Sequence, residues 1–244
     1  MRATVLIIAI FTAIPCVGEV ILDVDQRSLD AEYSYDGVGG SGSDYDELHA
    51  TDFSPLDFAI DLVSPIGAPF VESRAAQTSE YLIGSMQAGG SAGVHAVVGA
   101  GNMADLMASS VFAATFQITA PSHFTIDIDL DATLDIGADA LPNGWAAVTL
   151  TGPSGVLVDE SLTDAGGAIF GPLSVTRAGV LAPGSYTVVA EAVQSLDVPD
   201  ALFLGQGSSS YEISFDITPI PEPGTLLAVV LALAAARPRR TIRV

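Results

Sequence analysis

The sequence predicts an all-β fold, a single antiparallel β-sandwich of the jelly-roll or Ig-like type, flanked by an N-terminal signal helix and a C-terminal hydrophobic helix. From about residue 53, short runs of Val, Ile, Leu, Phe and Thr alternate with Gly, Pro, Asn and Ser clusters at roughly ten-residue spacing, as in sandwiches. The run 123–131 alternates apolar and polar residues, as a strand with one buried face requires. After removal of both ends, roughly 170 to 200 residues remain, which is enough for one domain.

The N-terminus has the three-part layout of a secretory signal peptide over residues 1–18. Arg2 is followed by an apolar stretch over 3–14 and then by small residues, so we expect cleavage between Gly18 and Glu19. Lipidation of Cys16 is the alternative, but Pro15 directly before it disfavours that reading. Because Cys16 is the only cysteine, the mature chain is expected to contain no disulfide and no cysteine metal site.

The exported part is expected to have two sections. Residues 19–52 are rich in Asp, Glu, Gly, Ser and Tyr and poor in large aliphatic residues, which predicts a solvated, partly flexible segment. Residues 53–218 form the predicted sandwich domain.

Within that domain the expected strands follow the period-two pattern and the turn residues. A turn at 141–144 leads into a strand at 145–150, which pairs as a hairpin with 156–162 across the turn residues 151–155. Further strands are expected at 166–175, after the Pro183–Gly184 turn, and at 211–217, directly before the proline-rich tail. Residues 84–115 favour strands with one helical turn near Met103–Met107.

The charge distribution excludes nucleic acid as a partner. The formal net charge is -21, and residues 19–223 contain all 29 acidic residues but only Arg27, Arg74 and Arg177 as cations. A surface of this kind repels phosphate backbones and favours solubility.

Two glycine-rich motifs match catalytic or cofactor patterns by spacing alone. Residues 99–104 fit the dinucleotide fingerprint but lack the acidic residue about 20 positions later that would hold a ribose hydroxyl. Ser91 has the spacing of a hydrolase nucleophile, yet all three histidines, His49, His95 and His123, lie in the first half of the chain, which is the wrong order for an α/β-hydrolase triad. We therefore expect no cofactor and no enzyme activity.

The acidic strand residues Asp127, Asp129 and Asp131 are candidates for a weak calcium surface. They do not form an EF-hand, because Ala132 and Ala138 occupy the positions of the required glycine and bidentate glutamate. Asp44, Asp46 and Glu47 have the same ambiguity, and a solvated strand face is the simpler interpretation of both sets. Trp145, the one tryptophan, is either a core residue or a platform for a sugar ring.

The C-terminal segment 219–244 has three parts. Pro221, Glu222 and Pro223 precede twelve apolar or near-apolar residues at 225–236, which are followed by Arg237, Arg239 and Arg240. As a helix the apolar run extends roughly 18 Å, which is short for a bilayer core of about 30 Å. It would therefore be a marginal anchor with its arginines on the cytoplasmic side.

This tail resembles the PEP-CTERM protein-sorting domain of bacterial exported proteins over residues 219–240. The resemblance implies that Pro221, Glu222 and Pro223 are recognised by an exosortase, a membrane processing enzyme, while the helix anchors the chain transiently and the arginines stop its transfer. The apolar run is somewhat short for that family, and Pro238 interrupts the basic cluster.

Together these features predict an exported, non-enzymatic surface or extracellular-matrix protein, held briefly in the inner membrane and then placed in the cell envelope or exopolysaccharide matrix. The alternatives are a secreted glycan-binding sandwich that uses Trp145 with exposed Tyr or Asp residues, and a secreted hydrolase with an unrecognised site.

Overall fold

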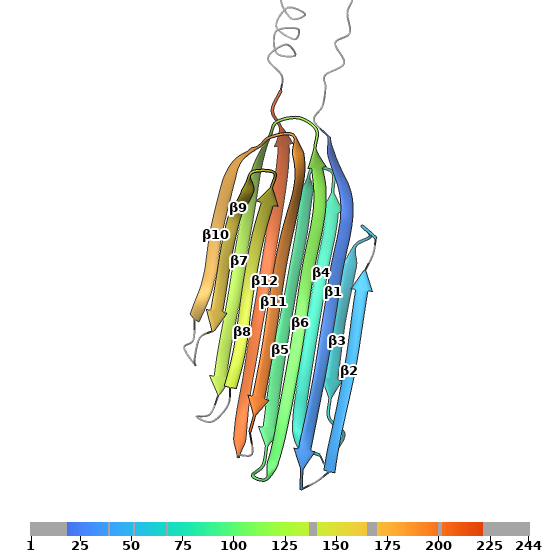
Figure 1. The fold of residues 1–244 in the computed structure, drawn as a ribbon, viewed down its shortest axis with the longest axis vertical. Coiled ribbons are helices and arrows are strands. Elements are labelled where there is room, and N and C mark those ends of the chain that lie inside the picture. The colour runs from blue at the N-terminus through green and yellow to red at the C-terminus, as the bar shows by residue number, and fades with distance from the viewer. Residues whose placement is uncertain are drawn as a thin grey trace, which may run out of the picture.

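The chain forms two six-stranded antiparallel sheets packed face to face in a computed structural model, which confirms the all-β sandwich (Figure 1). The structure describes residues 19–38, 40–50, 52–66, 68–136, 141–164, 170–199 and 202–221. Both predicted flanking helices, at 1–18 and 224–244, lie outside these residues. Within the described ranges, no helix is long and apolar enough to cross a membrane.

Sheet A contains, in spatial order, β2 (Gly40–Ala50), β1 (Val20–Gly37), β6 (Asn102–Ile118), β11 (Gly184–Val198), β8 (Leu141–Gly152) and β9 (Gly155–Asp164). Sheet B contains β10 (Phe170–Leu181), β7 (Ser122–Ile136), β12 (Phe203–Pro219), β5 (Ser85–Val98), β4 (Phe70–Leu82) and β3 (Leu56–Val63). The longest strand has 18 residues, which corresponds to roughly 60 Å at 3.3–3.4 Å per residue. The sandwich is accordingly elongated along its strands (Figure 1).

The core lies between the sheets and follows the predicted alternation. On β7 and β12 the predicted apolar positions are all buried: Phe124, Ile126, Ile128, Leu130, Tyr211, Ile213, Phe215 and Ile217. The ring of Phe215 meets that of Phe116 from sheet A at a centroid distance of 5.5 Å. These contacts place aromatic side chains from both sheets in one core.

Two predicted turns are confirmed. The β8–β9 hairpin pairs Gly152 with Gly155, whose φ of 108° lies in the range that glycine adopts without strain. Pro183 and Gly184 separate β10 from β11, which belong to different sheets.

The structure differs from the sequence prediction in three segments. Residues 20–37 and 40–50, expected to be partly flexible, form β1 and β2, so the sandwich begins at Val20 and not at residue 53. β1 is held because its ladder pairs with β6 on one side and β2 on the other. Met103–Met107 lies within β6, and 141–144 begins β8, so neither the helical turn nor the turn expected there forms.

A buried ion pair lies near the start of β1, and its hydrogen bonds to β4 link sheet A to sheet B. The Arg27 side chain points inward and lies 2.6 Å from Asp25, with both side chains fully shielded from solvent. Arg27 also donates to Ser79 Oγ on β4 at 2.8 Å and to Ser54 O at 2.8 Å. Tyr81 of β4 donates to Asp25 at 2.9 Å. This cluster fixes the connection that carries the chain from sheet A to sheet B.

Both ends of the sandwich emerge at the same place. Glu19 donates its N–H to Thr119 Oγ1 at 2.8 Å, and Ile220 donates to Pro121 O at 2.9 Å. Residues 119–121 connect β6 to β7, so this single loop contacts the chain before β1 and the chain after β12 (Figure 1). The loop that joins β5 to β6 lies at the opposite end of the long axis (Figure 1).

Candidate functional site

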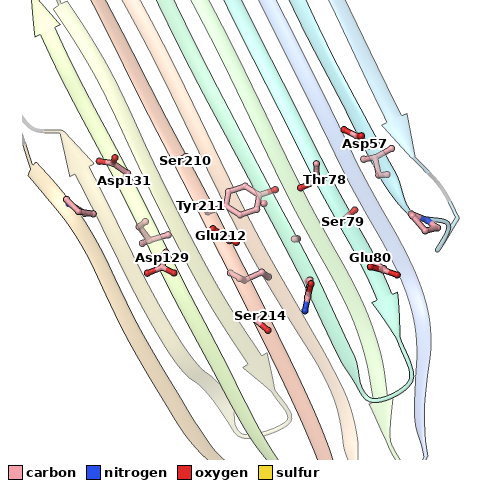
Figure 2. A pocket seen from close by; sticks show the side chains of 18 residues that line it. Asp57, Thr78, Ser79, Glu80, Asp129, Asp131, Ser210, Tyr211, Glu212 and Ser214 are labelled. Carbon is pink, nitrogen blue, oxygen red and sulfur yellow. The ribbon is translucent and has the colours of Figure 1, made fainter.

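A hollow of about 820 Å³ lies on the outer face of sheet B and is here called the acidic hollow. It spans all six strands of sheet B, and five carboxylates line it: Asp57, Glu80, Asp129, Asp131 and Glu212 (Figure 2). Its other polar side chains include Thr78, Gln87, Ser210 and Ser214. No cationic side chain belongs to the lining.

Strand register creates this arrangement. Period two turns Asp129 and Glu212 outward, while the antiparallel ladder places them directly opposite one another on β7 and β12. The same transverse row continues through Gly89 and Thr78 to Asp57 on the edge strand β3. Gly89 has no side chain, so it leaves a depression in the row between the Thr78 hydroxyl and the Glu212 carboxylate.

The electrostatics of the hollow are unbalanced. Like charges directly opposite on an antiparallel pair destabilise a sheet, and Asp129 faces Glu212 in this way. Asp131 contributes a shielded Oδ1 atom that has no hydrogen-bond partner among the described residues. The arginine on the outer face of sheet B, Arg74, is engaged by Asp61 at 3.1 Å and by Glu72. Such a surface favours cations or ligand hydroxyl groups and repels anions.

Among the predicted calcium candidates, the structure brings Asp129 and Asp131 into the hollow. Asp127 is directed to the same outer face and accepts a hydrogen bond from Thr176 Oγ1 at 2.6 Å. Successive outward residues on one strand are spaced by roughly 7 Å, so these three side chains do not wrap around a single point. The strand pattern of residues 123–131 does not indicate their neighbour Glu212, which lies 83 residues after its partner Asp129.

Trp145 lies on the other outer face, on β8 of sheet A, and not in the core. It is partly exposed, and its Nε1 donates to Glu191 at 3.1 Å. Its cross-strand neighbours are Val193 and Thr163. The structure therefore separates Trp145 from the acidic hollow by the full thickness of the sandwich.

The two glycine-rich motifs lie in β structure. Ser91 is an outward residue in the middle of β5, paired with Ala76 and Ser210, so no strand-to-helix elbow presents its hydroxyl. Residues 99–101 join β5 in sheet B to β6 in sheet A, and Asn102 closes this connection by donating to Gly99 O. A dinucleotide fingerprint would require a helix after the glycines.

Of the predicted processing residues, the structure describes Glu19 and Pro221. They lie at the common end of the sandwich, on either side of residues 119–121. Gly18, Glu222, Pro223, Arg237, Arg239 and Arg240 lie outside the described residues.

Comparisons with known proteins give no family for this chain. No protein-family model matches it, and no curated protein matches it. Among solved structures, the infectious bursal disease virus Gt strain aligns with a TM-score of 0.18 at 9% identity, covering 90% of this chain and 74% of that chain. The Gx strain aligns with a TM-score of 0.19 at 8% identity, covering 89% and 74%. At these TM-scores the likeness carries no structural or functional conclusion.

Proposed function

We propose that this chain is an exported, non-enzymatic surface or extracellular-matrix protein that is sorted through its C-terminal PEP-CTERM-like segment. The observation that carries the proposal is the position of Glu19 and Pro221 at one end of an elongated sandwich. With this geometry a membrane-held tail leaves the whole domain on one side of the bilayer. The β5–β6 loop then lies roughly 60 Å from the attachment point.

The surface of the domain supports an extracellular role. The outward side chains of β7 and β12 are mostly Ser, Thr, Asp and Glu, and these groups form hydrogen bonds with water or with the hydroxyl groups of a polysaccharide. An acidic surface also keeps neighbouring copies apart before they reach their destination.

In this proposal an exosortase-type enzyme recognises Pro221, Glu222 and Pro223 while the apolar residues 225–236 hold the chain in the inner membrane. Arg237, Arg239 and Arg240 stop transfer on the cytoplasmic side. Removal of the tail then delivers the domain to the cell envelope or matrix.

Mass spectrometry of the exported protein in its native host tests this sorting proposal. The mature chain is expected to begin at Glu19 and to lack residues 224–244. Glu222→Ala should leave the tail attached and the chain in the inner membrane, whereas Pro219→Ala, outside the motif, should be processed normally. A wild-type chain that keeps residues 224–244 in cells with an exosortase would show that the tail is an ordinary anchor.

Of the two expected sandwich types, we infer the jelly-roll type of winding. Consecutive strands from β5 to β8 alternate between the sheets, as do those from β9 to β12. In a jelly roll, such crossings connect nearly all strands, whereas Ig-like domains retain more connections within one sheet.

Glycan binding is the second candidate function, and the outward position of Trp145 favours it. A partly exposed indole whose Nε1 is fixed by Glu191 presents a rigid apolar surface of the kind on which sugar rings stack. Glycan-array binding that is lost in Trp145→Ala would support this function. Binding lost instead in Glu212→Gln would assign the glycan to the acidic hollow.

A further inference from the structure

A second group of metal-ligating side chains lies on the opposite outer face, on sheet A. Glu47 and His49 are two residues apart on β2 and therefore point to the same side of the sheet. Asp30 of β1 is directly opposite Glu47 in the antiparallel ladder. The three side chains thus converge from two paired strands, in contrast to the row of aspartates along β7.

We propose that Asp30, Glu47 and His49 form a binding site for a divalent transition metal ion of the Zn²⁺ class. One ligand atom from each residue lies within 4.8 Å of the other two, and His49 Nε2 is 3.8 Å from Glu47 Oε2. Ligand atoms around a tetrahedral Zn²⁺ are separated by roughly 3.4 Å, since each lies about 2.1 Å from the metal. The Glu47 and His49 side chains are 52% and 59% exposed, so small rotations can close the remaining gap.

The negative charges of Asp30 and Glu47 favour a cation at this position. Asp30 and Glu47 are like charges placed directly opposite, an arrangement that destabilises an antiparallel pair. All three arginines of the described residues bind other carboxylates: Arg27 binds Asp25, Arg74 binds Asp61 and Glu72, and Arg177 binds Glu160. The Tyr45 hydroxyl donates its one proton to Glu47 and lies 3.5 Å from Asp30 Oδ1. It therefore cannot donate a hydrogen bond to both carboxylates at once.

Asp30 is also held in place from outside the group. Ser109, a buried residue of β6, donates to Asp30 Oδ2 at 3.0 Å. A hydrogen bond of this type to one carboxylate oxygen orients the other oxygen toward a metal and is a regular feature of metal sites. The three strands β2, β1 and β6 therefore each contribute to the proposed site.

The donor set selects the class of metal. Calcium and magnesium prefer all-oxygen ligands, whereas one imidazole with two carboxylates suits Zn²⁺, Co²⁺ or Mn²⁺. Three protein ligands leave a fourth position for water or for a donor from another molecule.

Metal binding at this site would stabilise the pairing of the edge strand β2 with β1. β2 pairs only with β1, and its sequence GSGSDYDELHA is poor in residues that favour strands. A metal shared by Asp30 and Glu47 cross-links the two strands near the end where the chain leaves sheet A.

Isothermal titration of the full chain, purified without a histidine tag and stripped with a chelator, tests the site with ZnCl₂ as the probe. We expect one Zn²⁺ per chain, with at least a ten-fold loss of affinity in both His49→Ala and Glu47→Gln. His95→Ala is the matched control, because His95 lies 3.8 Å from a single carboxylate, Glu72, and should bind Zn²⁺ as the wild type does. Circular dichroism checks that each variant is folded.

Three results would contradict the proposal that these residues bind Zn²⁺. These are no saturable Zn²⁺ binding, an equal loss in His49→Ala and His95→Ala, or displacement of Zn²⁺ by an equal concentration of Ca²⁺. Titration with Co²⁺ gives a second measurement, because its visible absorption bands should appear in the wild type and disappear in His49→Ala. Bands that persist in His49→Ala would place the metal elsewhere.

Discussion

Replacement of Arg27 by alanine should be among the most destabilising single substitutions in this protein. The side chains of Arg27 and of its partner Asp25 are both 0% exposed. Removal of one partner from a buried ion pair leaves an uncompensated charge and typically costs about 3–5 kcal/mol. The carbonyl groups of Asp52 and Ser54 that Arg27 also binds lie in an exposed connection, where water can replace the lost donor. We therefore expect Arg27→Ala to lower the free energy of unfolding by about 3–5 kcal/mol at neutral pH.

The pH dependence of this loss adds a second measurement. Burial raises the pKa of Asp25, while the hydrogen bond from Tyr81 and the charge of Arg27 lower it. Without Arg27 the pKa rises further, so the folded variant holds a proton that the unfolded chain releases near pH 4. Stability of the variant should then fall as the pH rises from about 4 towards neutrality, because the folded state binds more protons. The difference from wild type should consequently be smaller at about pH 4 than at about pH 7.

Urea denaturation followed by circular dichroism at both pH values measures these quantities. Arg177→Ala is the matched control, because its ion pair with Glu160 is 2.5 Å long but its side chain is 49% exposed. Exposed pairs of this kind contribute about 0–1 kcal/mol. If Arg27→Ala lowers the free energy of unfolding no more than Arg177→Ala does at neutral pH, the buried ion pair does not stabilise the packing of the two sheets. A double Asp25→Asn, Arg27→Met variant should recover part of the loss, since no buried charge remains.

Three further predictions concern the core and its tyrosines. Gly90→Ala should lower the free energy of unfolding, measured by urea denaturation, by about 1–3 kcal/mol. The added Cβ would lie 2.3 Å from Ser110 Oγ and 2.4 Å from the Tyr211 ring. Gly89→Ala is the control and should be tolerated, because its nearest contact would be at 3.4 Å. Tyr211→Phe should lower the free energy of unfolding by about 1–3 kcal/mol in the same assay, because buried Gln77 loses the hydroxyl that accepts its hydrogen bond at 2.8 Å. An unchanged urea midpoint would show that this hydrogen bond does not stabilise the fold. Burial raises the pKa of Tyr211 to about 12 and also raises that of Tyr81, so the folded state retains protons that the unfolded state loses. Stability should accordingly fall as the pH rises above about 10, with tyrosinate absorbance increasing together with unfolding, and a flat stability profile between about pH 9 and 12 would contradict this.

Much of the fold could be predicted because the strands of the second half carry their burial pattern in their own residues. The run 123–131 and the run 211–217 alternate so regularly that the buried and exposed faces follow from period two alone. β1 was harder to predict, because two of its inward positions are Asp25 and Arg27, which a pattern of apolar residues does not recognise. Opposite charges two residues apart on one strand were the signal that could have identified this ion pair.

The candidate site could be predicted only in part for a related reason. The outward direction of Asp129 follows from its strand, but its pairing with Glu212 depends on the register between β7 and β12. The position of Trp145 on the surface also depends on which face of β8 meets the core, and Ala146, Val148 and Leu150 occupy that face.

The sequence by itself determined the all-β class, the orientation of several strands, the excess of negative charge and the candidate export and sorting segments, since each depends on neighbouring residues or on composition. The tertiary structure decided which carboxylates face one another, that residues 20–50 belong to sheet A, and that Glu19 and Pro221 emerge together. Those features depend on contacts between residues up to 134 positions apart. Strand order and register set such contacts, and a short-range pattern of side chains contains neither.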